Sequence, residues 1–188
     1  MRTTDDDQAD PPEPYASPTM GRHTGPKQSG DFRVMVKVLR AGSAARRARG
    51  VVRGVLRQAG VPADAVADAE IVVAELAANA EKHARPPYEL RITYVGRVPT
   101  WCEIVDGDPD SREVHLILDH LDTLTDGPSP PPTGEPSTLL AENGRGLLMA
   151  HHLSQGGCRV YPTTILTTST PGKAVAFPLP ACSGDLSL

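Results

Sequence analysis

The sequence predicts an α+β fold, a two-layer α/β sandwich in which a mixed, mostly antiparallel sheet carries its helices on one face. Three observations support this prediction. Short segments alternate apolar and polar residues with the period of strands, and longer segments repeat apolar residues at helical spacing. The chain has 188 residues, which is enough for one domain with a hydrophobic core.

Strands are expected at the start, in the middle and at the end of the domain. In the segment 31–38, apolar side chains occupy every second position from Phe32 to Val38. Two further segments, 88–96 and 100–107, are close enough in the chain to form a hairpin. The C-terminal part is expected to close the sheet with three strands, at 157–161, 163–170 and 173–179.

Two helices are expected between the first strand and the hairpin. The first covers 43–60, with Ser43 as its N-cap, and the second covers 62–84, with Asp64 as its N-cap. A third helix is expected in 144–154, in the sequence GRGLLMAHHLS.

Proline-rich segments divide the chain. Residues 1–30 are rich in proline and acidic residues and have few apolar side chains, so a disordered tail is expected there. The domain covers 31–180, and a short C-terminal tail covers 181–188. A second proline-rich stretch, 126–138, lies inside the domain; such a loop is either a functional lid or a tolerated surface insertion.

Composition excludes several classes of protein. The formal net charge of -4 offers no general attraction to nucleic acid or to an anionic membrane. The cysteines, Cys102, Cys158 and Cys182, are too widely spaced for a disulfide framework or a CxxC metal site. No apolar run approaches the ~20 residues of a membrane span, and the acidic N-terminus does not resemble a signal peptide. A cytoplasmic protein is expected.

Glu75 and Asn79 are the candidate chemical groups on the second helix. They are four residues apart, so their side chains are neighbours. On spacing alone an ordinary polar helix face explains the pair. Ile71 and Val72 lie close to the same face, which a purely solvated face rarely has, so a cleft is the second interpretation. An asparagine oxygen suits Mg²⁺, and a glutamate one turn earlier can accept a proton.

Two further stretches can complete a nucleotide site. Gly144 and Gly146 flank Arg145 directly before a helix, where backbone N–H groups and the helix dipole favour a phosphate; a simple turn is the alternative. Asp106 ends a strand, where its carboxylate can accept a hydrogen bond from an exocyclic amine such as that of adenine; the Asp106-Gly107 pair is otherwise typical of a turn.

Taken together and in this order, the stretches ELAANAEKHA (75–84), VDGDP (105–109) and ENGRGLLM (142–149) resemble the GHKL ATPases. That family includes gyrase B, sensor histidine kinases and MutL. The chain most resembles the bacterial anti-sigma-factor serine/threonine kinases, and the resemblance covers residues 31–180. It implies a Bergerat-type ATP-binding fold.

The resemblance also implies roles for individual residues. Glu75 would be the general base, and Asn79 would coordinate Mg²⁺ held by the phosphates of ATP. Residues 119–143 would form the ATP lid. The remaining residues implied to bind the nucleotide are Asp106 at the adenine amine, Gly107 beside it, and Gly144, Arg145, Gly146 and Leu147 on the phosphate side.

The chain departs from the family pattern at two places. The second motif usually reads D-x-G-x-G, whereas residues 106–110 read DGDPD. Near the C-terminus the family often has a threonine after Gly or Gly-Lys, whereas residues 172–174 read GKA. The missing hydroxyl would then come from Thr168 or Thr170.

The sequence is compatible with three functions. The first is a serine/threonine kinase that transfers the γ-phosphoryl group of ATP to a small anti-sigma-factor antagonist and also binds a sigma factor; the presence of Glu75 favours it. The second is a non-catalytic, ATP-dependent partner switch, which the altered second motif favours. The third is an interaction domain without a nucleotide, which requires three ordered motifs to coincide by chance. A homodimer is compatible with all three.

Histidines and arginines are further candidates for site residues. His151 and His152 are adjacent and therefore point in different directions on a helix, which argues against a shared metal. His83 either borders the cleft or is structural. The five arginines of the first helix form either a docking surface for an acidic partner or a solvated face.

Overall fold

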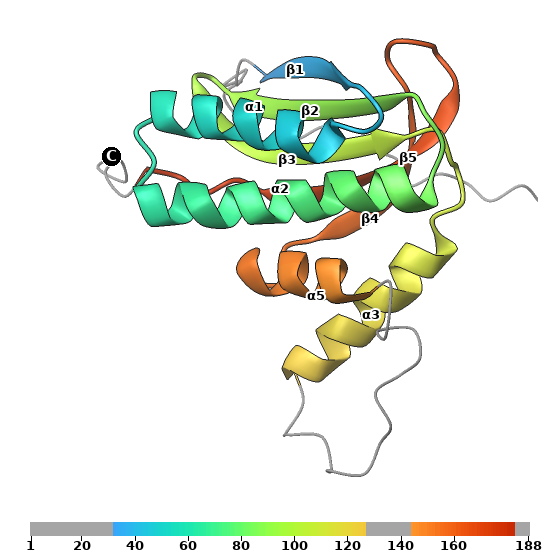
Figure 1. Cartoon of the computed structure of the whole chain (residues 1–188). Coiled ribbons are helices and arrows are strands. Elements are labelled where there is room, and N and C mark those ends of the chain that lie inside the picture. The colour runs from blue at the N-terminus through green and yellow to red at the C-terminus, as the bar shows by residue number, and fades with distance from the viewer. Residues whose placement is uncertain (1–31, 127–143, 183–188) are drawn as a thin grey trace, which may run out of the picture.

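The computed structural model of this protein describes residues 32–126 and 144–182. The described chain forms a two-layer α+β sandwich (Figure 1), which confirms the predicted fold class. In chain order, the elements are β1 (Phe32–Leu39), α1 (Ala44–Gln58), α2 (Ala63–His83), β2 (Tyr88–Val95), β3 (Val98–Asp106), α3 (Arg112–Asp126), α5 (Gly144–Leu153), β4 (Arg159–Thr164) and β5 (Pro171–Pro178).

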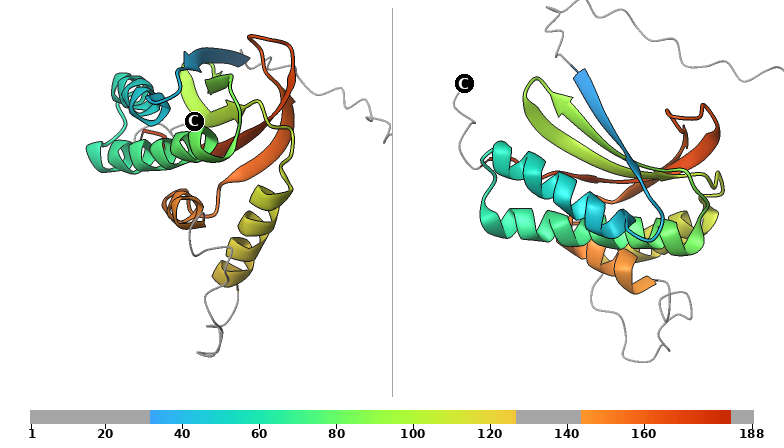
Figure 2. Two further views of the ribbon diagram at one scale, coloured as in Figure 1. Left: turned by 45° about the vertical axis from the view of Figure 1, so that its right-hand side comes forward. Right: turned by 45° about the horizontal axis from the view of Figure 1, so that its top comes forward.

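The five described strands form one sheet in the order β1-β2-β3-β5-β4, and every neighbouring pair is antiparallel. The predicted hairpin is β2 and β3. The last strand, β5, lies between β3 and β4, so that it pairs with a strand far away in the sequence. Figure 2 shows α1, α2 and α5 on one face of the sheet, and no described helix covers the other face.

The prediction of three C-terminal strands is wrong, because the structure has two. Residues 165–170 form a turn between them, closed by hydrogen bonds from Ile165 N to Thr170 O and from Ser169 N to Ile165 O. The buried carboxylate of Glu89 accepts hydrogen bonds from the N–H groups of Leu166 and Thr167. These local and side-chain bonds replace a strand ladder, although the threonine-rich sequence favours a strand.

Helix α3 was not predicted. It includes residues 119–126, so the expectation of a loop over 119–143 is wrong in that part, and 127–143 lies outside the described residues. The signal is present in the sequence: apolar residues recur at helical spacing at Val114, Ile117, Leu118 and Leu121. The last three are buried.

The N-terminal ends of α1 and α2 differ in part from the predicted caps. Ser43 is the N-cap of α1, as predicted, but its side chain does not cap the helix. Instead, Glu81 of α2 accepts hydrogen bonds from the backbone N–H groups of Ser43 and Ala44, at 3.2 and 3.1 Å. The N-cap of α2 is Pro62, not Asp64. Asp64 lies in the first turn, where its charge still complements the helix dipole.

The core lies between the sheet and the helices. Helix α2 is buried on a wide surface because α1 packs along one side of it and α5 along another. On β2, Leu90 and Ile92 point into this core, whereas the alternating Glu89 and Arg91 point to the opposite face of the sheet. The α2 face that carries Asn79 is therefore held against β3 and α5.

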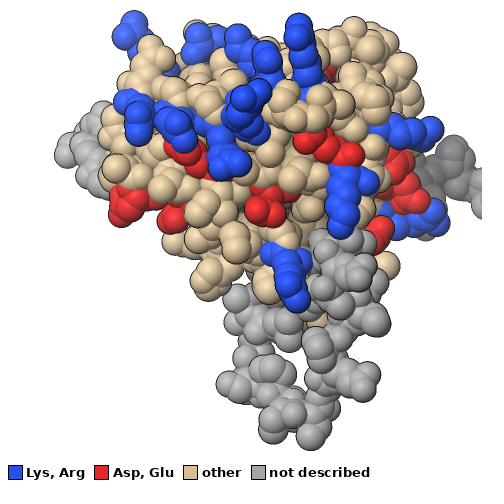
Figure 3. All heavy atoms as spheres, in the orientation of Figure 1, with Lys and Arg blue, Asp and Glu red and all other residues tan. Residues whose placement is uncertain are grey.

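Arginines cover the outer surface of α1. Figure 3 shows Lys and Arg side chains gathered over the part of the molecule where α1 lies. Arg53 forms a bidentate pair with Glu70 of α2, with N–O distances of 2.6 and 2.5 Å. A solvated face and a docking surface both remain predictions for the other arginines. Among the described residues, no helix has the length and apolar character to span a membrane.

Candidate functional site

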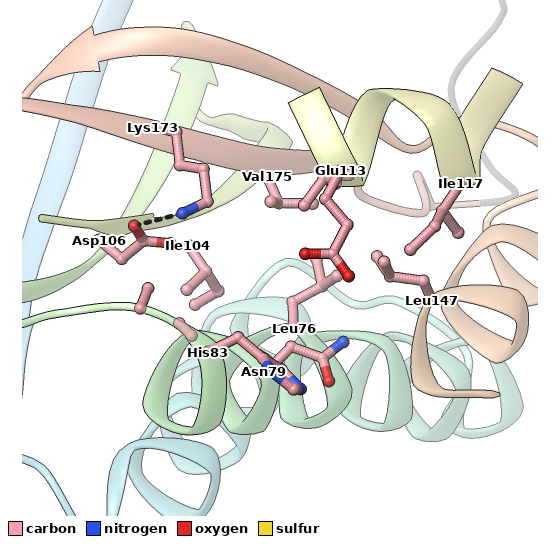
Figure 4. Close-up of a pocket in the computed structure, with 13 residues that line it drawn as sticks. Leu76, Asn79, His83, Ile104, Asp106, Glu113, Ile117, Leu147, Lys173 and Val175 are labelled. Carbon is pink, nitrogen blue, oxygen red and sulfur yellow. Dashed lines mark hydrogen bonds and ion pairs between the residues drawn. The ribbon is translucent and has the colours of Figure 1, made fainter. Parts of the chain in front are cut away.

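A pocket lies between α2, the ends of β3 and β5, α3 and the start of α5 (Figure 4). Its walls are mainly apolar, formed by Leu76, Ile104, Ile117, Leu147 and Val175. The polar side chains that line it are Asn79, His83, Asp106, Glu113 and Lys173. Apolar walls with a few polar groups suit a flat organic ligand that needs a specific orientation.

Asp106 and Lys173 form a buried ion pair at one end of the pocket. They are direct partners in the β3–β5 ladder, and Lys173 Nζ lies 2.9 Å from Asp106 Oδ1. The same ammonium donates to the carbonyl of Asp108 at 3.2 Å, and Asp108 N–H donates to Asp106 Oδ1 at 3.0 Å. Burial raises the pKa of Asp106 above its ordinary value, although the bonds from Lys173 and Asp108 oppose the rise.

Asn79 carries a buried polar atom with no partner. Its Nδ2 atom is shielded from solvent and makes no hydrogen bond among the described residues. Buried polar side-chain atoms in folded proteins are nearly always paired, since leaving one unpaired costs free energy. An unpaired amide nitrogen on a residue that lines a pocket points to a ligand.

Gly146 brings the first turn of α5 against Glu75 and Asn79. A Cβ atom at position 146 would lie 2.7 Å from Glu75 Oε2 and 3.3 Å from Asn79 Nδ2. The absence of a side chain at Gly146 therefore leaves room for the Glu75 carboxylate and the Asn79 amide beside the first turn of α5. Arg145 is exposed, and Leu147 is buried and lines the pocket. Gly144 is the first residue of α5.

Gly107 lies away from the pocket. Its N–H donates to the carbonyl of Arg85 at 2.7 Å, and a Cβ atom there would lie 2.7 Å from the carbonyl oxygen of Pro86. Gly107 thus packs against the α2–β2 connection and holds the end of β3 in place beside Asp106. Its predicted contact with a nucleotide remains a prediction.

The structure thus brings together Asn79, Asp106 and Leu147 in one pocket, with Glu75 and Gly146 next to Asn79. The pocket also contains residues that sequence reasoning missed, namely Lys173 from β5 and Glu113 from α3. Lys173 had no signal of its own, because its position opposite Asp106 depends on the strand pairing. Thr168 and Thr170, the expected substitutes for a hydroxyl, instead bond each other at 2.7 Å on the exposed turn.

The three candidate histidines, His83, His151 and His152, lie in different environments. His151 is buried, and its Nε2 atom lies 2.8 Å from Asp122 Oδ1, which joins α5 to α3. His152 is exposed, as expected for adjacent residues on a helix. His83 lines the pocket one turn beyond Asn79.

Fold and site define an α+β domain with a pocket for a small ligand between its main helix and the ends of its strands. The family model described as "Histidine kinase-like ATPase domain" matches residues 40–157, more than half of the chain. The protein therefore belongs to the histidine kinase-like ATPase domain family, which supports a GHKL-type ATPase domain and implies ATP binding. A comparison with curated proteins finds no match. The matched segment ends before β4 and β5, so Lys173 lies outside it.

Proposed function

We propose that this protein is an ATP-dependent serine/threonine kinase of the anti-sigma-factor type, which phosphorylates a small antagonist protein and thereby controls a sigma factor. One observation carries this proposal: the buried Nδ2 atom of Asn79, which has no hydrogen-bond partner among the described residues, lies near Gly146 in the first turn of α5, next to Glu75. A polar group without a partner in this place is accounted for by a ligand that approaches α5.

The pocket divides into two ends that suit the two ends of ATP. The purine would lie between apolar side chains such as Ile104 and Val175, with its edge at Asp106. The phosphates would lie toward the first turn of α5, where backbone N–H groups and the helix dipole favour negative charge. Arg145 is exposed at that turn and can add a charged donor.

Asn79 fits the role of a Mg²⁺ ligand. The amide side chain offers a neutral oxygen, and hard divalent cations in ATP sites keep most of their waters and bind few protein groups. Asn79 would hold the metal through the phosphates of the nucleotide, and the bound metal supplies neutralisation of phosphate charge. Leu76 and Leu147 keep the neighbouring space apolar and dry.

Glu75 fits the role of general base. The carboxylate is half-buried, and it forms no ion pair with another described residue. In the transfer, the serine or threonine oxygen of the substrate forms a bond to the γ-phosphorus while the bond to ADP breaks. Glu75 takes the hydroxyl proton, and ADP leaves with the electron pair.

The test is incubation of the full chain with γ-labelled ATP, Mg²⁺ and candidate antagonist proteins. We expect label on serine or threonine of one antagonist and a loss of about 10²–10⁴ in rate for Glu75→Gln. ATP affinity in that variant should stay within a few-fold, since the substitution preserves shape. An unchanged rate in Glu75→Gln would remove Glu75 from catalysis.

A second function, nucleotide binding without turnover, is favoured by the altered second motif. Residues 106–110 read DGDPD and lack the later glycines of the family pattern. ATP-dependent partner binding with no label transferred would support this partner switch. No binding of ATP at all would overturn both functions.

A further inference from the structure

The Asp106 carboxylate could bind adenine without a lysine beside it, so the presence of Lys173 in the pocket needs an explanation. Its side chain is 8% exposed and that of Asp106 is 3% exposed, and both line the pocket. Figure 4 shows the ammonium and the carboxylate side by side at the end of the pocket formed by the strands, across from Ile117 and Leu147. A ligand that reaches this end therefore meets a donor together with an acceptor.

Each member of the pair has unused hydrogen-bonding capacity. Both bonds to Asp106 go to Oδ1, and within the described residues Oδ2 accepts none. Lys173 has three N–H donors, of which two are used by Asp106 Oδ1 and the Asp108 carbonyl. The Asp108 carboxylate is 3.5 Å from Nζ, at the outer limit of a hydrogen bond. Asp106 Oδ2 is thus available as an acceptor, and a ligand can take the third N–H of Lys173 in place of the long contact to the Asp108 carboxylate.

We infer that Asp106 and Lys173 read the 1,6 edge of a purine in either polarity, so that the site accepts 6-oxopurine nucleoside triphosphates as well as ATP. This inference rests on the proposed nucleotide site. It makes Lys173 a specificity-determining residue that lies outside the segment matched by the family model.

The two purine edges have opposite hydrogen-bonding patterns. Adenine donates from its 6-amino group and accepts at N1, so Asp106 would take the amine and Lys173 would donate to N1. Hypoxanthine accepts at O6 and donates from N1–H, so Lys173 would donate to O6 and Asp106 would accept from N1–H. A carboxylate without the lysine would face the lone pairs of O6 and exclude this base.

The competing explanation is that Lys173 only neutralises a buried carboxylate. Pairing of a buried charge is a common structural requirement, and such a lysine would not contact the base. The two explanations differ in their nucleotide preference. A purely structural lysine leaves the pocket selective for adenine, whereas a base-reading lysine makes ATP and ITP comparable ligands.

The experiment measures the affinities of ATP, ITP and 1-deaza-ATP, which lacks the N1 acceptor, for the full chain with Mg²⁺. ITP differs from ATP in the polarity of positions 1 and 6. We expect ITP within about 10-fold of ATP and a loss of about 10-fold or more for 1-deaza-ATP, as for a hydrogen bond to a charged group. These wild-type measurements do not depend on the folding of any variant.

Lys173→Met tests the assignment to this residue. We expect the variant to lose ITP affinity by about 10-fold or more relative to ATP and to lose its preference for ATP over 1-deaza-ATP. A second variant, Lys173→Thr, supplies a hydroxyl group at the same position. Lys37→Met on exposed β1 is the matched control, and it should keep the nucleotide preferences of wild type. Thermal unfolding of each variant verifies the fold.

The outcomes separate this inference from the proposed function. Wild type that binds ATP but binds ITP more than about 100-fold more weakly would overturn the inference and leave the ATP site standing. Comparable ATP and ITP affinities that persist in Lys173→Met would also overturn it. Binding of neither nucleotide would overturn the proposed function and, with it, the inference.

Discussion

Two buried ion pairs lie on opposite faces of the same sheet, and they are satisfied to different extents. On the open face, Glu89 Oε2 accepts from Arg91 Nη2 at 2.6 Å, and Leu166 and Thr167 also donate to the carboxylate. On the helix face, Asp106 pairs with Lys173 in the pocket and keeps one oxygen without a described donor. The first pair is closed by the protein itself, and the second has room for a ligand.

The titration of the two carboxylates follows this difference. Burial acts to raise the pKa of Glu89, but hydrogen bonds from Thr167 and Arg91 outweigh it and leave the pKa below its ordinary value. Burial also raises the pKa of Asp106, and there the bonds from Lys173 and Asp108 do not outweigh it. Hydrogen bonds therefore stabilise the charged form of Glu89 more fully than that of Asp106.

The largest expected effect is a loss of stability when Glu89 is removed from its ion pair with Arg91. Glu89→Ala leaves the Arg91 guanidinium buried and releases the 165–170 turn, so we expect a loss of about 3–5 kcal/mol in the free energy of unfolding. Chemical denaturation measures it. Glu103→Ala is the control, because Glu103 Oε2 is 3.9 Å from Arg91 Nη1 and makes a weaker contact.

Lys173→Met sharpens the same comparison. We expect it to cost less stability than Glu89→Ala, about 1–3 kcal/mol, because Asp108 still donates to Asp106. An equal loss of unfolding free energy in the two variants would mean that the Asp106–Lys173 pair stabilises the fold as much as the Glu89–Arg91 pair does.

Asn79→Ala tests the unsatisfied end of the pocket. Since its Nδ2 atom has no described partner, we expect the stability without nucleotide to change by less than about 1 kcal/mol. The affinity for Mg·ATP should fall by about 10- to 100-fold, as for loss of a bond to a charged group. Calorimetric titration with and without Mg²⁺ measures this, with the exposed Gln58→Ala as control. Equal affinities throughout would exclude the metal-ligand role.

Gly146→Ala should act on function more than on stability. The added Cβ meets the flexible end of Glu75, which can move aside, so we expect a stability loss of about 1 kcal/mol. Displacement of Glu75 should lower phosphotransfer by more than about 10-fold. Gly54→Ala is the matched control, since its Cβ on exposed α1 meets no described atom within 4 Å and should stabilise the helix slightly. Equal rates in both variants would contradict the close approach at α5.

The smallest effect is the pH dependence, which should have opposite signs at the two carboxylates. Glu89 has a lowered pKa, so its contribution is present above the unfolded value of about 4.3 and is lost as pH falls through the folded value. Asp106 has a raised pKa, so its contribution is present below about 3.9 and is lost as pH rises through the folded value. Unfolding curves of Glu89→Gln and Asp106→Asn between pH 3 and 7 should therefore deviate from wild type in opposite directions.

Much of the fold and part of the site are readable in the sequence. Helices α1 and α2 and the β2–β3 hairpin follow from local periodicity, because the residues that define each of them are close in the chain. Glu75 and Asn79 are neighbours on one helix, so their proximity needs no tertiary information. Helix α3 also has a readable apolar pattern, although a proline-rich stretch follows it directly in the sequence.

Tertiary structure alone decided how the ends of the pocket are completed. Lys173 reaches Asp106 because β5 inserts between β3 and β4, and strand order depends on the energy of the whole sheet. The 165–170 turn is held by Glu89, 77 residues away from Leu166 in the chain, so threonine-rich local propensity could not predict it. Local sequence determined which groups are present on each element, whereas long-range strand pairing and helix packing determined which of them meet, because such contacts depend on the whole chain being folded.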